Sequence, residues 1–304
     1  EQAAADLDAA LATIPFPSPN QRYQRGLAWY HLGNYEAAYA DFEAALNGGL
    51  DNVYTFYYHG LVAYHFKDFA RARDDFTQTL IRKPDLNTAH YMRGLAHYHL
   101  GDYSLAQADF DTVLLANSNN AAAYRYRGLA FYRLGLFDSA TADFTSAIQL
   151  DDADAVAYLY RGLIAKNANQ IEAALADLNR ALDLRPDSLT ALYARARIYY
   201  RQGNYKIAQP GFEQVIQLDP QHTNAHYYLG LILYKRGLYR DAIDQFTVVV
   251  NLDPTRAWAF YYRGLAYRKA GQYPQARADF LQAIALDPRH SPAGKAQIML
   301  RKLP

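Results

Sequence analysis

Apolar residues recur along this chain with a helical period that is interrupted by short polar turns. Between residues 87 and 100, aromatic and aliphatic side chains return every three or four positions, and the same spacing resumes between residues 103 and 116. Gly101, between the two segments, is the residue type that ends helices in the left-handed conformation. The pattern therefore predicts two helices joined by a tight turn.

The predicted helix pair repeats every 34 residues. The first helix of each copy carries a glycine or, once, an alanine in the same phase: Gly26, Gly60, Gly94, Gly128, Gly162, Ala196, Gly230 and Gly264. The second helix carries an alanine followed four residues later by a phenylalanine, as at Ala106 and Phe110, and Leu178 is the one exception. Below, repeats are numbered 1 to 8 and positions are counted from the first-helix glycine or Ala196, so that Tyr98 is at +4 of repeat 3.

Small side chains are expected where the two helices of a pair meet. Gly94 and Ala106 are predicted to face each other, because only small residues let two helix backbones approach closely, and Phe110 is predicted to fill the groove beside them. A single pair cannot bury both of its faces, so neighbouring pairs are expected to stack. Prolines such as Pro84 and Pro220 follow several second helices and prevent them from continuing.

In these features the chain resembles the tetratricopeptide repeat family. The resemblance rests on the period, the small residues at Gly94 and Ala106, the aromatic residues and the closing prolines, over about nine-tenths of the chain. It implies an all-α fold, a right-handed superhelical solenoid of antiparallel helix pairs. It also implies a concave groove, lined by the first helices, that binds peptide segments or partner helices.

The resemblance also divides the chain. We predict eight repeats over residues 19–288, a half-repeat or cap helix with a proline-rich connector over residues 1–18, and a C-terminal cap helix over residues 289–304. Residues 1–11 read like a second helix without its first helix, either from a trimmed array or as a native cap. Residues 14–20 contain Pro15, Pro17 and Pro19 and predict a stiff, extended connector.

A charged series accompanies the repeat. Arginine occupies position −1 in six repeats, with His59 and Leu229 in the other two: Arg25, Arg93, Arg127, Arg161, Arg195 and Arg263. Aspartate recurs just before the second-helix phenylalanine or leucine: Asp41, Asp75, Asp109, Asp143, Asp177 and Asp279. A half-buried arginine needs a partner, so an Arg–Asp bridge is predicted in each such repeat. The spacing leaves open whether the bridge lies within one repeat or between adjacent repeats.

A stripe of tyrosine and leucine is the predicted ligand surface of the groove. Its candidate residues are Tyr57, Tyr91, Tyr193, Tyr227 and Tyr261 at −3, Leu61 and Leu95 at +1, and Tyr64, Tyr98, Tyr132, Tyr200 and Tyr234 at +4. Tyrosine offers a large contact area with one polar tip, which suits an interface. The alternative is that these rings only pack between neighbouring first helices.

Cations run beside this stripe. Position +5 carries a basic ladder broken by Asn167: His31, His65, His99, Arg133, Arg201, Lys235 and Lys269. The cationic groove candidates are Arg125, Arg133, Lys166, Arg197, Arg201, Lys235 and Arg268. They indicate an acidic or C-terminal carboxylate ligand, unless they only complement the negative ends of helix dipoles. Histidines on separate helices at this spacing make a poor metal site, although they can titrate near neutral pH.

Composition and motifs exclude several classes of protein. The chain has a net charge of +1 and no cysteine, which removes disulfides and thiolate metal sites, and it has no apolar run long enough to span a bilayer. Metalloprotease, phosphate-loop and serine-hydrolase motifs are absent from the sequence, so no catalytic residue, metal or cofactor is predicted. Composition assigns no compartment: the cytoplasm and a processed, exported form both fit.

The resulting prediction is a non-catalytic scaffold for a protein or peptide partner, an acidic one included. The carboxylate clamp of chaperone-binding family members is not carried over, because tyrosine and leucine stand where the clamp has lysine and asparagine. Binding of single-stranded nucleic acid competes with this prediction but is disfavoured by the near-zero net charge. Self-assembly into homo-oligomers through the solenoid ends is a third alternative.

Overall fold

The structure, a computed structural model, describes residues 6, 9, 17–289 and 291–303. Those residues form helices and connecting turns, with no strand among them. The helices are α2 (Pro19–His31), α3 (Tyr35–Asn47), α4 (Val53–His65), α5 (Phe69–Arg82), α6 (Asn87–Leu100), α7 (Tyr103–Ala116), α8 (Ala121–Leu134), α9 (Phe137–Leu150), α10 (Ala155–Asn167), α11 (Ile171–Leu184), α12 (Leu189–Arg201), α13 (Tyr205–Leu218), α14 (Thr223–Lys235), α15 (Tyr239–Leu252), α16 (Ala257–Lys269), α17 (Tyr273–Leu286) and α18 (Ser291–Arg301). The predicted half-repeat over residues 1–11 lies almost entirely outside the described residues.

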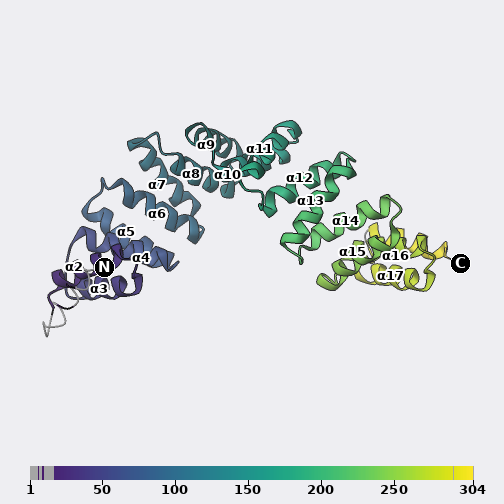
Figure 1. Cartoon of the computed structure of the whole chain (residues 1–304), viewed down its shortest axis with the longest axis horizontal. Helices are drawn as coiled ribbons and strands as arrows, with labels where there is room; N and C mark the ends of the chain where they lie inside the picture. The colour runs from purple at the N-terminus through teal and green to yellow at the C-terminus, as the bar shows by residue number, and fades with distance from the viewer. Residues whose placement is uncertain (1–5, 7–8, 10–16, 290, 304) are drawn as a thin grey trace. The chain divides into compact units, whose positions relative to one another are not determined.

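The helices pack as adjacent pairs inside two compact units, unit 1 (Glu1–Arg161) and unit 2 (Gly162–Pro304). In unit 1, α6 packs on α7 and α7 packs on α8; in unit 2, α14 packs on α15 and α15 packs on α16 (Figure 1). The predicted helices at residues 87–100 and 103–116 are α6 and α7, with the predicted bounds. The all-α fold of stacked helix pairs is therefore confirmed.

Local sequence explains where the helices begin and turn. Ser18 caps α2 in a capping box: its hydroxyl accepts from the Gln21 N–H, and the Gln21 side chain accepts from the Ser18 N–H. Pro19 is the first helical residue, so the predicted extended connector was wrong in running through Asn20. Asn169 adopts the left-handed conformation, with φ of 61°, in a turn position that most repeats fill with glycine.

The first-helix glycine makes room for an aromatic ring. A Cβ atom on Gly94 would lie 3.0 Å from Cε1 of Phe110 and 3.2 Å from Cβ of Asp109. The Phe110 ring thus lies directly beside Gly94, as predicted. In repeats 5 and 8 such a Cβ atom on Gly162 or Gly264 would also lie 3.3 Å from the backbone oxygen of Ala174 or Ala276, the alanines in the phase of Ala106.

Repeat 6 reverses this arrangement. A Cβ atom on Gly211, in the second helix, would lie 2.9 Å from Cβ of Ala196 in the first helix. In this repeat the glycine at the contact between the two helices therefore lies in the second helix, and alanine takes its usual place in the first helix. Although Pro210 lies inside α13, the helix is continuous.

The repeats are joined by stacked aromatic rings. The second-helix phenylalanine is fully buried and, at five junctions between consecutive repeats, stacks on a tyrosine at −2 of the next repeat. These pairs are Phe42–Tyr58, Phe110–Tyr126, Phe144–Tyr160, Phe212–Tyr228 and Phe246–Tyr262, with ring centroids 5.4 to 6.1 Å apart. Two junctions lack the tyrosine, and we call them open junctions: the 2/3 junction has Met92 at −2, and the 5/6 junction has Ala194.

Arginine and aspartate pair within a repeat. Arg93 donates two hydrogen bonds to Asp109, through Nε at 2.9 Å and through Nη2 at 2.7 Å. The same pair of hydrogen bonds joins Arg25 to Asp41, Arg127 to Asp143 and Arg263 to Asp279. The spacing left open whether these arginines bind within one repeat or between repeats. Both occur, because some arginines also donate to the second helix of the preceding repeat. Arg127 Nη1 donates to Asp111 at 2.6 Å, and Arg195 Nη1 donates to Asn179 at 3.0 Å.

The exceptions in the series have their own partners. In repeat 2, Nδ1 of the buried His59 lies 2.7 Å from Oδ2 of Asp75. In repeat 7, where Leu229 and Gln245 replace the charged pair, Nδ1 of His226 lies 2.7 Å from Oε1 of Gln245. A polar link between the two helices of the pair is therefore kept without the arginine.

Candidate binding surfaces

The predicted tyrosine stripe is half-buried in packing between helices, except for Tyr261, which is 6% exposed and belongs to the core around Phe280. Each candidate tyrosine at −3 lies against the phenylalanine of its own repeat, with centroids 5.8 to 6.1 Å apart: Tyr57, Tyr91, Tyr193, Tyr227 and Tyr261. Each candidate at +4 lies 5.3 to 5.7 Å from the aromatic ring at +9 of its own repeat: Tyr64, Tyr98, Tyr132, Tyr200 and Tyr234. These rings therefore hold the helix pairs together, and only part of each is available to a ligand.

Burial also sets the chemistry of these rings. Desolvation, with a smaller effect of neighbouring tyrosines, raises the pKa of Tyr64, Tyr91 and Tyr200 to about 12. Their hydroxyl groups stay protonated at neutral pH and keep a proton to donate. The stripe is uncharged and can offer hydrogen bonds at its exposed edges.

Two hollows lie beside the open 2/3 junction, and we call them the unit 1 hollows. The first, of about 470 Å³, is lined by Tyr30, Tyr35, Leu61, Tyr64, His65, Lys67, Phe69, Met92 and His99. The second, of about 310 Å³, is lined by Tyr57, Asn87, Thr88, Tyr91, Met92, Val113, Asn117 and Asn120. Met92 borders both. The structure thus brings together Tyr57, Leu61, Tyr64 and Tyr91, whereas Leu95 is only 6% exposed and belongs to the core around Phe110.

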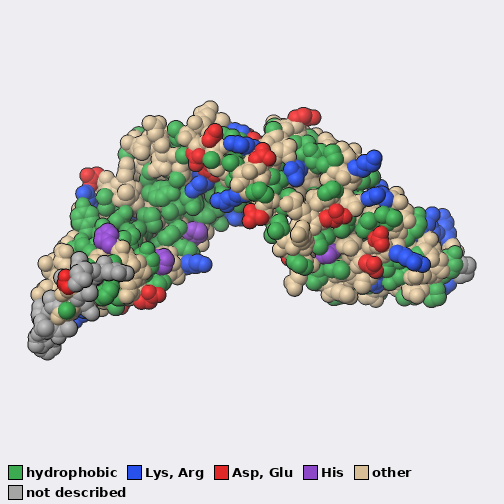
Figure 2. All heavy atoms as spheres, in the orientation of Figure 1, with side chains coloured by type: hydrophobic (Ala, Val, Ile, Leu, Met, Phe, Trp, Pro, Cys, Tyr) green, Lys and Arg blue, Asp and Glu red, His purple; other side chains and the backbone are tan. Residues whose placement is uncertain are grey.

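The histidines of the basic ladder are seated on aromatic rings. His99 stacks on Phe69 of the preceding repeat with centroids 4.4 Å apart, and its Nε2 lies 3.1 Å from the Tyr64 hydroxyl. His65 packs in the same way on Tyr35, at 4.0 Å. Burial lowers the pKa of His99. In Figure 2, the face of unit 1 in view is largely hydrophobic, with histidine side chains among the apolar ones.

The other cationic candidates outside the 5/6 junction have separate roles. Arg125 donates to the buried Asp154 at 3.1 Å, so its charge is already paired. Interaction with Tyr98 raises the pKa of Arg133, and Lys235 Nζ lies 5.5 Å from the ring centroid of Tyr205. Arg268 is half-buried, and its Nε has no hydrogen-bond partner within the described part of the chain.

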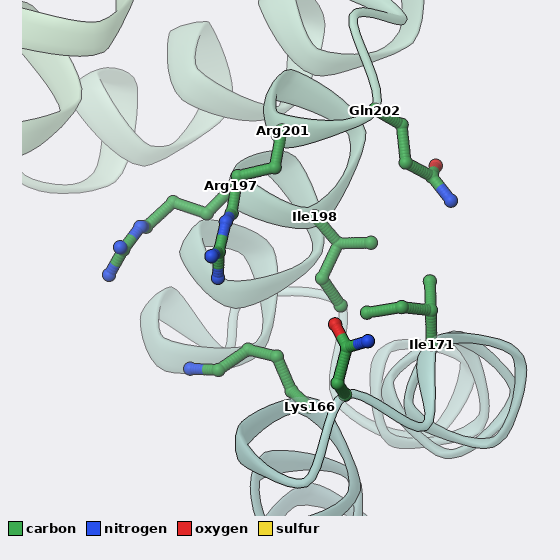
Figure 3. Close-up of a pocket in the computed structure, with 7 residues that line it drawn as sticks. Lys166, Ile171, Arg197, Ile198, Arg201 and Gln202 are labelled. Atoms are coloured by element: carbon green, nitrogen blue, oxygen red, sulfur yellow. The ribbon is translucent and has the colours of Figure 1, made fainter.

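Three predicted cations converge in unit 2 beside the open 5/6 junction. A pocket of about 250 Å³, which we call the cationic pocket, is lined by Lys166, Asn169, Ile171, Arg197, Ile198, Arg201 and Gln202. Figure 3 shows the charged ends of Lys166, Arg197 and Arg201 on one side of this pocket and Ile171 and Ile198 turned toward each other on the other. The lining contains no acidic side chain. Burial, together with the charges of Arg197 and Arg201, lowers the pKa of Lys166.

Arg197 is held in place by rings. Its guanidinium lies 5.6 Å from the ring centroid of Tyr193 and 5.5 Å from that of Tyr228. Its Nε is buried and has no hydrogen-bond partner among the residues that the structure describes. The side chain therefore presents a fixed, incompletely satisfied donor group.

Two other kinds of site are absent from the described residues. They contain no cluster of three or more histidine, cysteine, aspartate or glutamate side chains that could hold a metal ion. Their helices are also all too short or too polar to cross a membrane.

Sequence comparison places the repeats in a known family. The tetratricopeptide repeat model matches residues 57–106, 91–155 and 193–257, which is more than half of the chain. A second tetratricopeptide repeat model matches residues 257–290, and a TPR repeat model matches residues 166–203. The chain belongs to the tetratricopeptide repeat family, whose members generally serve as protein-interaction scaffolds and are generally non-catalytic.

Solved structures of this family have the same fold. YrrB, described as a TPR protein with an unusual peptide-binding site, is 24% identical, with a TM-score of 0.58 over 62% of this chain and 97% of its own. The C-terminal part of a TPR protein from Cytophaga hutchinsonii is 19% identical, with a TM-score of 0.62 over 79% of this chain and 98% of its own. PilF of Pseudomonas aeruginosa is 17% identical, with a TM-score of 0.60 over 70% and 97%. A search of curated proteins finds no match.

Proposed function

We propose that this protein is a non-catalytic scaffold that binds an extended peptide of a partner protein along its first helices, with the unit 1 hollows as anchor sites. The observation that carries the proposal is the pair of hollows, of about 470 and 310 Å³, that meet at Met92. Family membership supports a protein or peptide partner, and the hollows supply a place for it.

The lining of the hollows fits a peptide. Aromatic rings and Leu61 offer apolar walls for two side chains, and the flexible thioether of Met92 can adapt between them. Asn87, Asn117 and Asn120 line the second hollow, and their amides can donate to and accept from the main chain of an extended segment. A small number of fixed polar groups on an apolar surface is typical of a ligand site.

The test fills the hollows with a larger side chain at Met92. Peptides are selected from a random display library on the full chain, and their affinities are then measured for Met92→Tyr, which restores the residue found at −2 in five other repeats. We expect affinity to fall about tenfold or more while the fold is retained, because the new ring occupies the space that the peptide uses.

Gln24→Tyr is the matched control. Gln24 is the exposed residue at −2 of repeat 1, so the variant adds the same ring in the same unit away from the hollows. Affinity should be unchanged in this control. If no peptide is selected, or if the selected peptides bind Met92→Tyr as tightly as the original protein, the proposal is wrong.

A further inference from the structure

Repeats 5 and 6 depart from the pattern of this chain at positions that meet in one place. Position +1 is leucine in seven repeats but arginine at Arg197, and position +4 is tyrosine in six repeats but lysine at Lys166. The turn position +7 is glycine in six repeats but asparagine at Asn169. All three departures line the cationic pocket. Residues that break a local pattern together are expected at functional sites.

The pocket lies at the 5/6 junction, whose core carries smaller side chains than the stacked junctions do. Leu178 replaces the second-helix phenylalanine, and Ala194 replaces the tyrosine that stacks on it at five other junctions. Both residues are buried, so the core at this junction is closed with smaller side chains. The volume of about 250 Å³ is enough for one small anionic group and a few waters.

The charges in the pocket lack the acidic partners that this chain gives to other half-buried arginines. Arg127 is paired with Asp143 and Asp111, and Arg125 with Asp154. Lys166, Arg197 and Arg201 instead lie in a lining without an acidic side chain. Mutual repulsion and burial of like charges cost free energy, and a bound anion removes this cost.

We propose that the cationic pocket binds an oxyanion carried by a peptide, either a phosphorylated side chain or a carboxylate. The guanidinium groups of Arg197 and Arg201 can each donate two parallel hydrogen bonds to such a group, and Lys166 adds a point charge. Asn169 and Gln202 supply amide donors, while Ile171 and Ile198 form an apolar wall for the aliphatic part of the ligand (Figure 3). This inference rests on the proposed function in one respect: the oxyanion is taken to be part of a peptide.

The site differs from the carboxylate clamp considered above. That clamp needs lysine at −3, where repeat 5 has Leu159 and repeat 6 has Tyr193. Here the cations come from +4 of one repeat and from +1 and +5 of the next.

Inorganic phosphate titrated into the full chain in a calorimeter is the first arm of the test. We expect saturable binding that weakens about tenfold or more in Arg197→Leu and in Lys166→Tyr, because each removes one of three charges. Both variants install the residue that most other repeats have at that position, which favours retention of the fold. Arg201→Asn is a further variant at an exposed position and mimics Asn167.

Lys235→Asn is the matched control, since Lys235 has the same position, +5, in the same unit but does not line the pocket. It should leave phosphate affinity unchanged. Equal weakening in this control would show diffuse attraction to positive charge and would overturn the proposal. Absence of saturable binding by the original protein, both of phosphate and of the acidic peptides below, would also overturn it.

The second arm uses three peptides of one sequence that carry phosphoserine, glutamate or serine at a single position. Preference for phosphoserine identifies a phosphoryl ligand, and equal binding of phosphoserine and glutamate identifies a carboxylate-type ligand. Serine binding as well as either would contradict the proposal, as would a single-stranded oligonucleotide that binds more tightly than all three. Met92→Tyr should leave phosphate binding unchanged, so failure of the unit 1 hollows can be told apart from failure of the cationic pocket.

Discussion

The 2/3 junction in unit 1 and the 5/6 junction in unit 2 both lack the stacking tyrosine at −2, but their surfaces differ. At the 2/3 junction, Met92 borders two hollows lined by aromatic rings, histidine and asparagine. At the 5/6 junction, Ala194 replaces the ring, and the neighbouring pocket is lined by Lys166, Arg197 and Arg201. Both junctions without the stack thus have a hollow surface nearby, and the residues that line it decide what kind of ligand it suits.

The stacked junctions show what the open ones lack. At the 3/4 junction, Tyr126 stacks on Phe110 and lies 6.3 Å from Tyr91 and 6.0 Å from Tyr98 by ring centroids. One ring at −2 therefore contacts both candidate tyrosines of the preceding repeat and closes the space between repeats. In a repeat protein such nearest-neighbour contacts supply much of the stability. An open junction therefore has fewer of these stabilising contacts, and it leaves surface between the repeats that a ligand can use.

The largest expected effect comes from opening a stacked junction. Tyr126→Ala should lower the free energy of unfolding by about 3 kcal/mol, because it removes a large ring from a packed cluster. Met92→Ala, at the open 2/3 junction, should lower it by about 1–2 kcal/mol, since Met92 already borders empty space. Urea unfolding of the two variants measures both. Equal losses would contradict the distinction between stacked and open junctions.

The next largest effect tests the reversed helix contact in repeat 6. Gly211→Asp restores the aspartate of other repeats but places a Cβ atom 2.9 Å from Cβ of Ala196, so it should cost about 1–3 kcal/mol. Ala196→Gly should rescue the variant, because it recreates the usual glycine and places an aspartate near Arg195. Thermal unfolding of the two single variants and the double variant checks this. Strictly additive losses would show that the two residues do not compensate each other.

The sequence was sufficient for the features that depend on spacing alone. The period and the bounds of α6 and α7 follow from residues at fixed separations in one helix pair. The Arg–Asp pairing was also predicted, but the spacing alone left open whether each bridge lies within one repeat or between two. Contacts to a neighbouring repeat were harder to predict, because they require the relative placement of two pairs. The second bond of Arg127, to Asp111, is of this kind.

The candidate sites show the same limit. Arg125 and Arg197 were predicted together as groove cations, but the fold brings the buried Asp154 to Arg125 and no acidic side chain into the pocket around Arg197. The stacking tyrosines at −2 were missed, although their recurrence at Tyr58, Tyr126 and three later repeats was visible in the sequence. Recognising that series would have marked Met92 and Ala194 as the departures.

A smaller effect is expected from closing an open junction. Met92→Tyr should raise the free energy of unfolding by about 0.5–1.5 kcal/mol, the contribution of an added aromatic pair, because a ring at this position can stack on Phe76. The gain should accompany the loss of peptide affinity that is expected of the same variant. Calorimetric melting beside Gln24→Tyr measures it. A loss of stability would mean that the 2/3 junction cannot accept the ring and that its open state is not due to Met92 alone.

The smallest effect separates the two open junctions by pH. Burial lowers the pKa of His99, so the unfolded chain binds more protons than the folded chain as the pH falls through the ordinary histidine range near 6.5. Stability at the 2/3 junction should therefore decrease slightly on acidification below about pH 6.5 and level off below the folded-state pKa. In His99→Asn, which mimics Asn167, this contribution is removed.

The measurement is the difference in melting temperature between the original protein and His99→Asn, followed from pH 8 to pH 5. The difference should shift against the original protein as the pH falls, because only the original protein must place a proton on the ring between Phe69 and the Tyr64 hydroxyl. The same comparison with Lys166→Tyr should be flat in this range, since no histidine lines the cationic pocket. If the difference in melting temperature for His99→Asn does not change with pH, the two open junctions do not differ in acid sensitivity.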